Sequence, residues 1–447
     1  MLALALPAPA QPSSLSLPAN RVSCRRPGPP APQCDNPCMT SARITTPPTA
    51  GLPLQWRDLW PWGDAQLDRA LAAWLGVPGV LLECSGTSAL MVALRTLQQL
   101  QPTRGEVIVP AYTCPLVAMA VAQCGLQIRL CDLAQDSLDM DADALRGLLS
   151  AQTLAVLPTH LAGRVADVAL ARHCAQAVGA YVIEDAAQAL GARVNGHSVG
   201  LQGDVGLFSM AVGKGLTTYE GGVLVARDAA MLAALRATHQ ATVRVSRWWE
   251  CRRSAELLGY AALFRPATMD AVYGAPLRKS LARADWIEAA GDDFDAQIPQ
   301  HTLGAWRRRV GVRALARLAA HWQAAEQQAL RRSAQLAALP GIEVVGDAAA
   351  QAQGIWPVIA LRMPNQAMRD ALMQSHWASG WGLSLPFVHV LPDYAQYAPL
   401  LGAARHDAAW QARDWAQRLV AVSNSAWLSD AQFADLLQAL QQFTQRA

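Results

Sequence analysis

Two kinds of hydrophobic pattern alternate along the chain from about residue 64 to about residue 230. Short apolar runs such as "EVIVP" (Glu106 to Pro110) and "AYVIED" (Ala180 to Asp185) have the length and composition of buried strands. Between them lie stretches with helical spacing, for example "TSALMVALRTLQQL", which directly follows Ser85-Gly86. Apolar strands that alternate with amphipathic helices predict an α/β fold with a mainly parallel sheet covered by helices.

The pattern changes after about residue 230. Residues 231–335 have helical spacing almost throughout and are rich in Ala, Arg and Leu. The runs "GIEVVGD" and "GIWPVIALRM" then predict two strands of a smaller α/β unit, followed by helices to the C-terminus. We therefore expect a large domain with a helical connection over residues 51–290 and a small C-terminal domain over residues 291–447.

The first 50 residues are rich in proline and show no periodicity, which predicts a disordered tail. The apolar start "MLALALPAPAQPSS" lacks a positively charged beginning and is interrupted by prolines, so it does not favour a signal peptide. Met39 opens "MTSARITTPP" and would serve equally well as a start. We interpret the first 38 residues as an upstream misassignment or a dispensable tail.

Composition narrows the class of protein. No run of eighteen or more uncharged apolar residues is present, so no membrane span is expected, and the richest short run, Leu257 to Leu263, predicts a buried helix. The net charge of +3, from 37 basic and 34 acidic residues, lacks the basic footprint of a nucleic-acid-binding protein. The nine cysteines include no CxxC pair, so we expect no metal site and reduced thiols in a cytoplasmic protein.

The segment "SGTSAL" (Ser85 to Leu90) joins a strand to a helix through a glycine-containing turn. Such a turn exposes backbone N–H groups at the positive end of the helix dipole, which suits a phosphate group. Serine and threonine also cap many helices, so a purely structural role remains an alternative.

Asp185 ends the predicted strand "AYVIED", at the edge of the sheet where open α/β folds bind ligands. A buried carboxylate at that place needs a partner because an unpaired buried charge is costly. A protonated pyridine nitrogen would be such a partner, and a salt bridge or a helix cap is the alternative.

Lys214 lies in "GDVGLFSMAVGKGLTTYEGG" (Gly203 to Gly222) and is the only lysine or arginine between Arg193 and Arg227. The flanking residues, Gly213 and Gly215, permit unusual backbone angles and the close approach of a ligand. A lysine among small residues near a dry cleft can lose its proton and become a nucleophile. A solvent-exposed loop lysine is the alternative.

Together with "VPAYT" and "PTHLAGRVAD", these segments resemble the DegT/StrS family of sugar aminotransferases, which have the PLP-transferase fold of type I. The resemblance is dense from about Leu67 to Arg227 and weaker towards the C-terminus. It implies pyridoxal 5′-phosphate (PLP) as cofactor and a homodimer with each active site at the subunit interface. It also implies transfer of an amino group from glutamate or glutamine to a keto sugar nucleotide, for polysaccharide or amino-sugar biosynthesis.

The same resemblance assigns expected roles to individual residues. Lys214 would bind the cofactor covalently and then move protons, and Asp185 would bind the pyridine nitrogen. The other expected cofactor-binding residues are Gly86, Thr87, Ser88, Tyr112, Gln188 and Ser209. The expected substrate-side residues are His160, for which a structural role is an equal alternative, and Glu220 and His389.

The chain departs from the family pattern at three places. Cys114 stands where the family often has an aromatic residue that stacks on the cofactor ring, so we expect stacking from Tyr112 or from elsewhere. The family's Asn that reaches the neighbouring subunit's phosphate is missing from the best-matching segment, Asp295 to Trp306. Tyr219 replaces the glycine that precedes Glu220. The "SLPFVHVLPDY" segment resembles the family's substrate lid, which is the basis for choosing His389.

Other functions remain open on the sequence alone. An aminotransferase that acts on a cyclitol or another non-nucleotide ketone would keep the same residues. A non-catalytic PLP-binding regulatory protein of the same fold is an alternative from another class. A dehydratase on this fold is disfavoured because such members replace the lysine with histidine.

Overall fold

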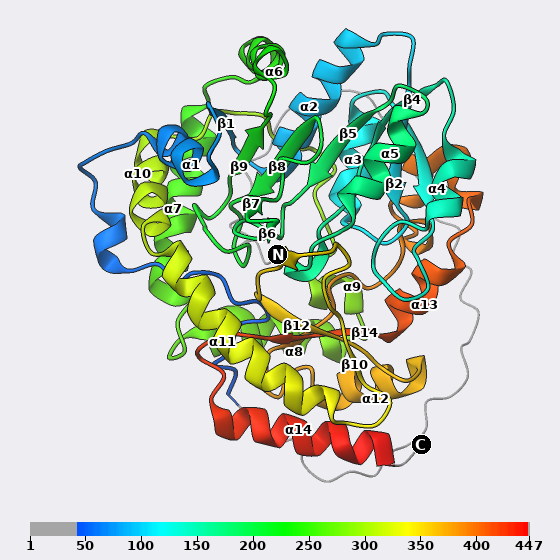
Figure 1. The fold of residues 1–447 in the computed structure, drawn as a ribbon. Helices are drawn as coiled ribbons and strands as arrows, with labels where there is room; N and C mark the ends of the chain where they lie inside the picture. Colours follow the sequence, from blue (N-terminus) through cyan, green and yellow to red (C-terminus); the bar gives the residue numbers. More distant parts are fainter. Residues whose placement is uncertain (1–42, 446–447) are drawn as a thin grey trace, which may run out of the picture.

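The largest sheet has seven strands in the order β1-β9-β8-β5-β4-β2-β3 (Figure 1). Neighbouring strands are parallel except at β9, which runs antiparallel to both β1 and β8. The prediction of a mainly parallel sheet is therefore confirmed in this computed structural model, which describes residues 43–445. The strands are β1 (Val80–Glu83), β2 (Glu106–Pro110), β3 (Gln127–Cys131), β4 (Thr153–Val156), β5 (Tyr181–Asp185), β8 (Val205–Ser209) and β9 (Gly222–Val225).

Helices cover both faces of this sheet because successive strand residues face opposite sides. In β2, Val107 and Val109 pack with α2 and α3 on one face, whereas Ile108 packs with α4 and α5 on the other. The helices α1 and α10 cover the end formed by β1, β9 and β8. These helices are α1 (Leu67–Leu75), α2 (Gly86–Leu100), α3 (Pro115–Gln123), α4 (Ala142–Leu148), α5 (Val168–Gln176) and α10 (Ala305–Leu315).

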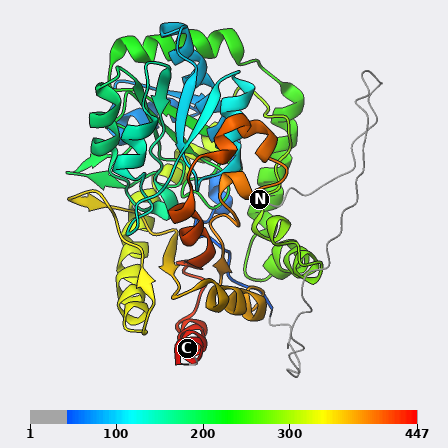
Figure 2. The same ribbon diagram turned by 90° about the vertical axis from the view of Figure 1, so that its right-hand side faces the viewer.

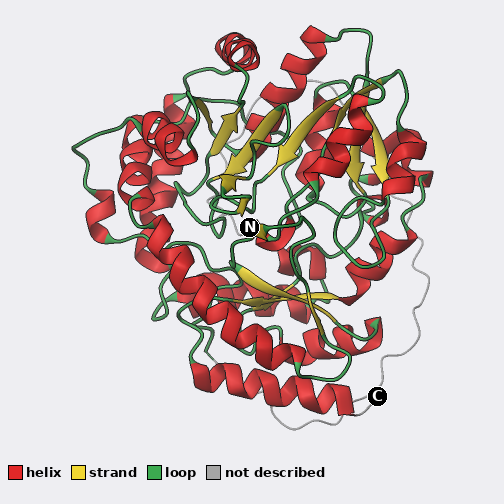
Figure 3. Ribbon diagram, viewed as in Figure 1, coloured by secondary structure: helices red, strands yellow, loops and turns green. Residues whose placement is uncertain are grey.

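A second, smaller sheet lies below the first in Figure 3 and has the order β10-β12-β14-β13, with all pairs antiparallel. Two of its strands fall in the two runs predicted as strands of a smaller unit. The strands are β10 (Glu343–Val344), β12 (Val358–Arg362), β13 (Leu383–Ser384) and β14 (Leu419–Ser423). The helices around it are α12 (Gln366–His376), α13 (Trp410–Arg418) and α14 (Asp430–Gln445). A third set of two-residue strands comprises β6 (Arg193–Val194), β7 (His197–Ser198) and β11 (Ala352–Gln353).

One long helix, α11 (Leu318–Ala337), links the two parts, which are stacked in the turned view of Figure 2. Its first residues, Leu318 and Trp322, belong to the core beneath the large sheet. Its later residues, Ala329 and Leu336, belong to the core of the small sheet. The same helix therefore stabilises both parts by burying apolar surface.

The segment between the two sheets is helical over most of its length, as predicted. It contains α6 (Ala229–Thr242), α7 (Arg247–Leu263), a π-helical turn η3 (Asp270–Gly274), α8 (Ala275–Ala282) and α9 (Trp286–Ala290). Residues 291–304 contain no helix, and they reach the large sheet, where the Pro299 carbonyl accepts the thiol of Cys84 (3.2 Å) directly after β1. This departure from the predicted pattern matters because the loop reaches the candidate site.

Two expectations were wrong. Residues 43–50 were expected to be disordered, but Ile44 donates its N–H to Asp270 (2.9 Å) and Ala50 donates its N–H to the Pro357 carbonyl (2.8 Å). The run from Leu257 was expected to be a buried helix, but Leu258 is 48% exposed. Leu257 is buried, so α7 packs through one face only. The expectations for residues 1–38 and for a start at Met39 lie outside the described residues.

Among residues 43–445, no helix combines the length and apolar character needed to cross a bilayer. The same residues contain no group of three or more His, Cys, Asp or Glu side chains arranged to hold a metal ion.

Candidate active site

Lys214 lies on a loop that only small residues can form. Gly213 and Gly215 have φ angles of 80° and 89°, in the left-handed region that favours glycine. A Cβ atom at Gly213 would lie 2.1 Å from Oγ1 of Thr49, and one at Gly215 would lie 2.8 Å from the ring of Trp322. The glycines that suggested a special loop are therefore required by both backbone angle and space.

Three acidic groups lie within electrostatic range of the Lys214 amine: Asp185, Asp292 and the thiol of Cys114. Burial lowers the pKa of Lys214 below that of an ordinary lysine, and these three groups oppose the shift. The amine is thus easier to deprotonate than that of a solvated lysine, which is what a nucleophilic lysine requires.

Asp185 occupies the last position of β5, and its carboxylate accepts the N–H of Ala187 (3.0 Å). Burial raises the pKa of this carboxyl group, and the Ala187 N–H and Lys214 oppose the rise. No arginine or lysine of residues 43–445 forms an ion pair with Asp185, although the residue is only 5% exposed. A buried carboxylate that lacks a cationic partner fits the protonated ring nitrogen of PLP.

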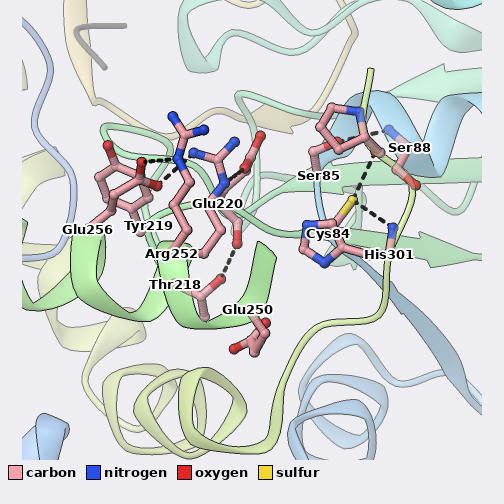
Figure 4. Close-up of polar contacts among 12 residues, drawn as sticks. Cys84, Ser85, Ser88, Thr218, Tyr219, Glu220, Glu250, Arg252, Glu256 and His301 are labelled. Carbon is pink, nitrogen blue, oxygen red and sulfur yellow. Dashed lines mark hydrogen bonds and ion pairs between the residues drawn. The ribbon is translucent and has the colours of Figure 1, made fainter. Parts of the chain in front are cut away.

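The turn from β1 into α2, which carries Ser85 and Ser88 (Figure 4), lies beside Ser209 at the end of β8. A Cβ atom at Gly86 would lie 3.1 Å from Cβ of Ser209, so the two expected phosphate-binding positions are adjacent. Ser85 caps the helix by accepting the Ser88 N–H (3.0 Å). The N–H groups of Gly86 and Thr87 have no protein acceptor among the described residues. They remain available to a phosphate at the helix N-terminus.

Ser88 was an expected cofactor-binding residue, but its hydroxyl donates to the buried carboxylate of Glu83 (3.0 Å). Glu83 also contacts Nδ1 of His239 (2.5 Å). Ser88 therefore ties the first turn of α2 to Glu83 at the end of β1, and the structure favours a structural role for its side chain.

Gln188 lies three residues after Asp185, in the turn that follows β5, and is partly buried. Its side-chain oxygen accepts the N–H of Ala162 (3.0 Å), which leaves the amide NH₂ group as a donor. This orientation is compatible with the expected place beside the cofactor's phenolic oxygen, which is an acceptor.

His160 is fully buried and uses both ring nitrogens within the protein. Nε2 contacts the carboxylate of Glu184 (2.8 Å), and Nδ1 accepts the N–H of Ala166 (2.9 Å). Glu184 precedes Asp185 on β5 and faces the opposite side of the strand. The contacts favour the structural alternative for His160 over a contact with substrate.

Glu220 was expected on the substrate side, and its carboxylate is bound to Nε of Arg253 from α7 (2.5 Å). Its main-chain oxygen accepts the Thr218 hydroxyl (3.0 Å), as Figure 4 shows, and Nη1 of Arg307 (2.6 Å). Tyr219, which replaces the family's glycine, has a φ of 70°. The chain thus keeps the backbone shape of a glycine with a tyrosine, at a cost in strain.

Tyr112 and His389 meet at one segment of the chain. The Tyr112 hydroxyl donates to the Phe387 carbonyl (3.0 Å) and accepts the Phe387 N–H (3.2 Å), and the two rings pack edge to face. His389 is partly buried, with its ring against that of Tyr394.

Cys114 lies near Lys214, and burial raises the pKa of its thiol to about 12. The expectations that Tyr112 stacks on the ring and that His389 contacts substrate stay predictions.

Asp292 is a member of the site that the sequence analysis missed. It is 3% exposed and lies in the loop of residues 291–304. The doublet "DD" after Gly291 reads as an ordinary solvated turn, and no local pattern distinguishes Asp292 from the exposed Asp293. A long-range contact map would have been needed to find it.

A model of the DegT/DnrJ/EryC1/StrS aminotransferase family matches residues 62–296, which is more than half of the chain. Over 185 residues the chain is 32% identical to a GDP-perosamine synthase of Vibrio cholerae, covering 41% of this chain and 50% of that protein. Over 166 residues it is 36% identical to an L-glutamine:2-deoxy-scyllo-inosose aminotransferase of Streptomyces fradiae, covering 37% and 39%. The chain thus spans about half the length, or less, of these curated relatives.

Solved structures extend the likeness over almost all of the fold. An aminotransferase of Helicobacter pylori involved in the biosynthesis of pseudoaminic acid superposes with a TM-score of 0.69 at 16% identity. The match covers 90% of this chain and 100% of that one. At this identity the likeness establishes the fold, including the smaller C-terminal part that the family model does not reach.

Proposed function

Because the chain belongs to the DegT/DnrJ/EryC1/StrS aminotransferase family, we propose that it is a PLP-dependent transaminase. The aminotransferases of this family use PLP. The observation that carries the proposal is that Lys214, on its glycine-flanked loop, lies within electrostatic range of the buried Asp185 carboxylate, which forms no ion pair within residues 43–445. Both lie at one edge of the sheet with the turn at Gly86, where one cofactor can contact all three.

PLP, when bound, supplies an electron sink that stabilises negative charge on the reacting carbon of the substrate. Lys214 Nζ would hold the cofactor through its aldehyde carbon, with loss of water, and would carry a proton to and from the substrate carbon. The Asp185 carboxylate would hold the proton on the ring nitrogen. The amides of Gly86 and Thr87 and the hydroxyl of Ser209 would bind the phosphate. The Gln188 NH₂ group would donate towards the phenolic oxygen.

The proposed reaction moves an amino group from glutamate or glutamine to a keto sugar nucleotide. The relative from Vibrio cholerae is named for a GDP-linked sugar, which supports this substrate class. On the substrate side, His389 is the better placed of the predicted residues because its ring is partly exposed. Glu220 would influence the substrate only indirectly, through Arg253, with which its carboxylate forms an ion pair.

A second candidate is transamination of a cyclitol ketone. The observation that favours it is the likeness to the scyllo-inosose aminotransferase from Streptomyces fradiae, whose name gives both a cyclitol ketone and glutamine as donor. The two candidates share every cofactor-binding residue and differ only in the acceptor.

We further propose a cytoplasmic homodimer. The six described cysteines are all unpaired, as reducing conditions would leave them. Exposed apolar side chains on α7, including Trp248 (69%) and Leu258 (48%), are available for contact with a second copy. Light scattering of the purified chain would test the dimer, and a monomer at micromolar concentration would contradict it.

The test of the proposed function begins with purified full-length protein incubated with PLP. The protein should become yellow, and glutamate or glutamine should shift the visible absorbance as the amino group is transferred. A panel of keto sugar nucleotides and cyclitol ketones should then restore the original spectrum for one acceptor class. Colour without any donor response would favour the non-catalytic binding protein, and failure to bind PLP would overturn the proposal.

A further inference from the structure

Asp292 forms a buried network that the proposed mechanism does not use. Its carboxylate accepts the N–H of Val388 (2.8 Å) and the hydroxyl of Tyr394. Its main-chain oxygen accepts the hydroxyl of Tyr397 (2.8 Å). The loop of residues 291–304 is thereby tied to a segment of the chain almost a hundred residues further on.

The network ends on the segment that carries His389. The Tyr394 hydroxyl accepts the N–H groups of Val388 (3.0 Å) and His389 (3.2 Å). From the other side, the Tyr112 hydroxyl binds both main-chain groups of Phe387. Every residue from Phe387 to His389 is therefore held by a buried phenol or by Asp292.

Asp292 also affects the charge state of Lys214. The groups that act on the lysine are the two carboxylates of Asp185 and Asp292 and the thiol of Cys114. Burial keeps the Cys114 thiol protonated, since its pKa is raised to about 12. If Asp185 pairs with the cofactor's ring nitrogen, Asp292 is the one carboxylate of this set left to face the amine. Burial raises the pKa of Asp292, and the hydrogen bonds from Tyr394 and Val388 and the charge of Lys214 oppose this rise by favouring the ionised carboxylate.

We propose that Asp292 is a positioning residue with two effects: its carboxylate fixes the Phe387–His389 segment beside the site and keeps a negative charge near the Lys214 ammonium. The inference rests on the proposed function of Lys214. It assigns to Asp292 control over the pH at which the lysine becomes a nucleophile. Other titratable groups lie around Asp292 and Lys214. Cys114 and Tyr112 follow β2, and Asp185 ends β5. His389 and Tyr394 come from the C-terminal part of the chain, where Tyr394 contacts Asp292 directly.

Four variants separate the two effects. Asp292→Asn removes the charge and weakens the tie, whereas Tyr394→Phe loses the phenol's hydrogen bonds but keeps the charge. Asp293→Asn is the matched control, because Asp293 is the adjacent carboxylate and is exposed. Asp292→Glu restores the charge and guards against a variant that merely folds poorly.

The first readout is amide hydrogen exchange of the full-length protein. The Val388 and His389 amides should exchange about ten-fold faster in Asp292→Asn and Tyr394→Phe than in the wild type, because each loses a buried hydrogen bond. They should be unchanged in Asp293→Asn. Unchanged exchange in both Asp292→Asn and Tyr394→Phe would overturn the positioning effect.

The second readout is the pH dependence of amine labelling with trinitrobenzenesulfonate, followed by peptide mass spectrometry. The chain has only two lysines, Lys214 and Lys279, and the exposed Lys279 serves as an internal reference. Loss of a nearby negative charge favours the neutral amine, so the Lys214 midpoint should fall by about one pH unit in Asp292→Asn. It should stay near the wild-type value in Tyr394→Phe, Asp292→Glu and Asp293→Asn.

An unchanged Lys214 midpoint in Asp292→Asn, with correct folding shown by circular dichroism, would overturn the electrostatic effect. This labelling needs no cofactor, so it tests Asp292 even if the protein does not bind PLP. A parallel pH titration of the visible absorbance of PLP-loaded protein should show the same downward shift. Absence of any PLP absorbance in the wild type would instead contradict the proposed function, and the two failures are therefore distinguishable.

Discussion

The two sides of the candidate site differ in how far apart along the chain their contacts lie. On the cofactor side, Asp185, Ser209 and Lys214 come from β5, β8 and the loop that follows β8, within about thirty residues. On the other side, Asp292 contacts Tyr394 across 102 positions, and Tyr112 contacts Phe387 across 275 positions. The first side is encoded by local strand–turn motifs, whereas the second exists only once the two sheets are packed together.

The largest expected effect tests the cofactor side. Lys214→Ala should lower turnover by at least about 10³-fold, because the variant loses both the nucleophile and the group that moves the proton. Lys279→Ala, at the exposed lysine of α8, is the control and should retain wild-type turnover. Steady-state kinetics of both variants measure the difference, and repeated turnover by Lys214→Ala would remove the lysine from its assigned role.

Adjacent residues of β5 offer a smaller but sharper contrast. Asp185→Asn should lower turnover by about 10²- to 10³-fold, because the ring nitrogen loses its anionic partner. Glu184→Gln changes the neighbouring carboxylate, which faces away and binds His160 and the N–H groups of Gly200 and Gln202. It should instead lower the free energy of unfolding by about 1–3 kcal/mol.

Turnover, the visible spectrum and urea denaturation of both β5 variants check this contrast. Asp185→Asn should alter turnover and spectrum with little loss of stability, and Glu184→Gln should do the reverse. Equal effects of the two substitutions on the spectrum would contradict the assignment of opposite faces.

Gly213→Ala tests whether the lysine loop depends on its backbone. A methyl group at this position meets Thr49 and adopts an unfavourable positive φ, which costs about 1–2 kcal/mol before the clash is counted. We expect a lower melting temperature and weaker PLP binding, measured by calorimetry and by absorbance. Gly196→Ala is the matched control, because Gly196 also has a positive φ but nothing lies near its Cβ position. Loss of PLP binding in both variants would contradict a local effect.

Tyr394→Phe tests the distant side and should have the smallest effect. Release of the Val388 and His389 amides should raise KM for the amino acceptor about two- to five-fold, since a hydrogen bond contributes about 1 kcal/mol. The absorbance of PLP-loaded protein before substrate is added should not change. A changed spectrum with an unchanged KM would contradict this account, because it would mean that Tyr394 acts on the cofactor side and not on the acceptor side.

The sequence was informative where chemistry and backbone signals coincide. Gly213 and Gly215 flank the lysine for steric reasons, and Asp185 ends a buried strand, so both could be found from local pattern. Ser85 was correctly placed at a helix N-terminus because capping is also local. The order of the strands, with β9 antiparallel, is not encoded in any one segment.

Local pattern failed where neighbours decide the outcome. Ser88 lies in the expected turn, but its hydroxyl is bound to Glu83, so its motif position did not predict its direction. Asp292 and Asp293 are identical in sequence terms and differ only because Val388 and Tyr394 pack over the first. The exposed face of α7 was missed because an apolar run alone does not show which side is covered.

The most direct test of the central claim uses the fact that the chain has only two lysines. Borohydride reduction of PLP-loaded protein, followed by peptide mass spectrometry, identifies the lysine that carries the cofactor. We predict that the added mass is found on the peptide that contains Lys214, with none on the peptide that contains Lys279. Added mass on Lys279, or on neither lysine of a protein that remains yellow until reduction, would contradict the assignment of Lys214.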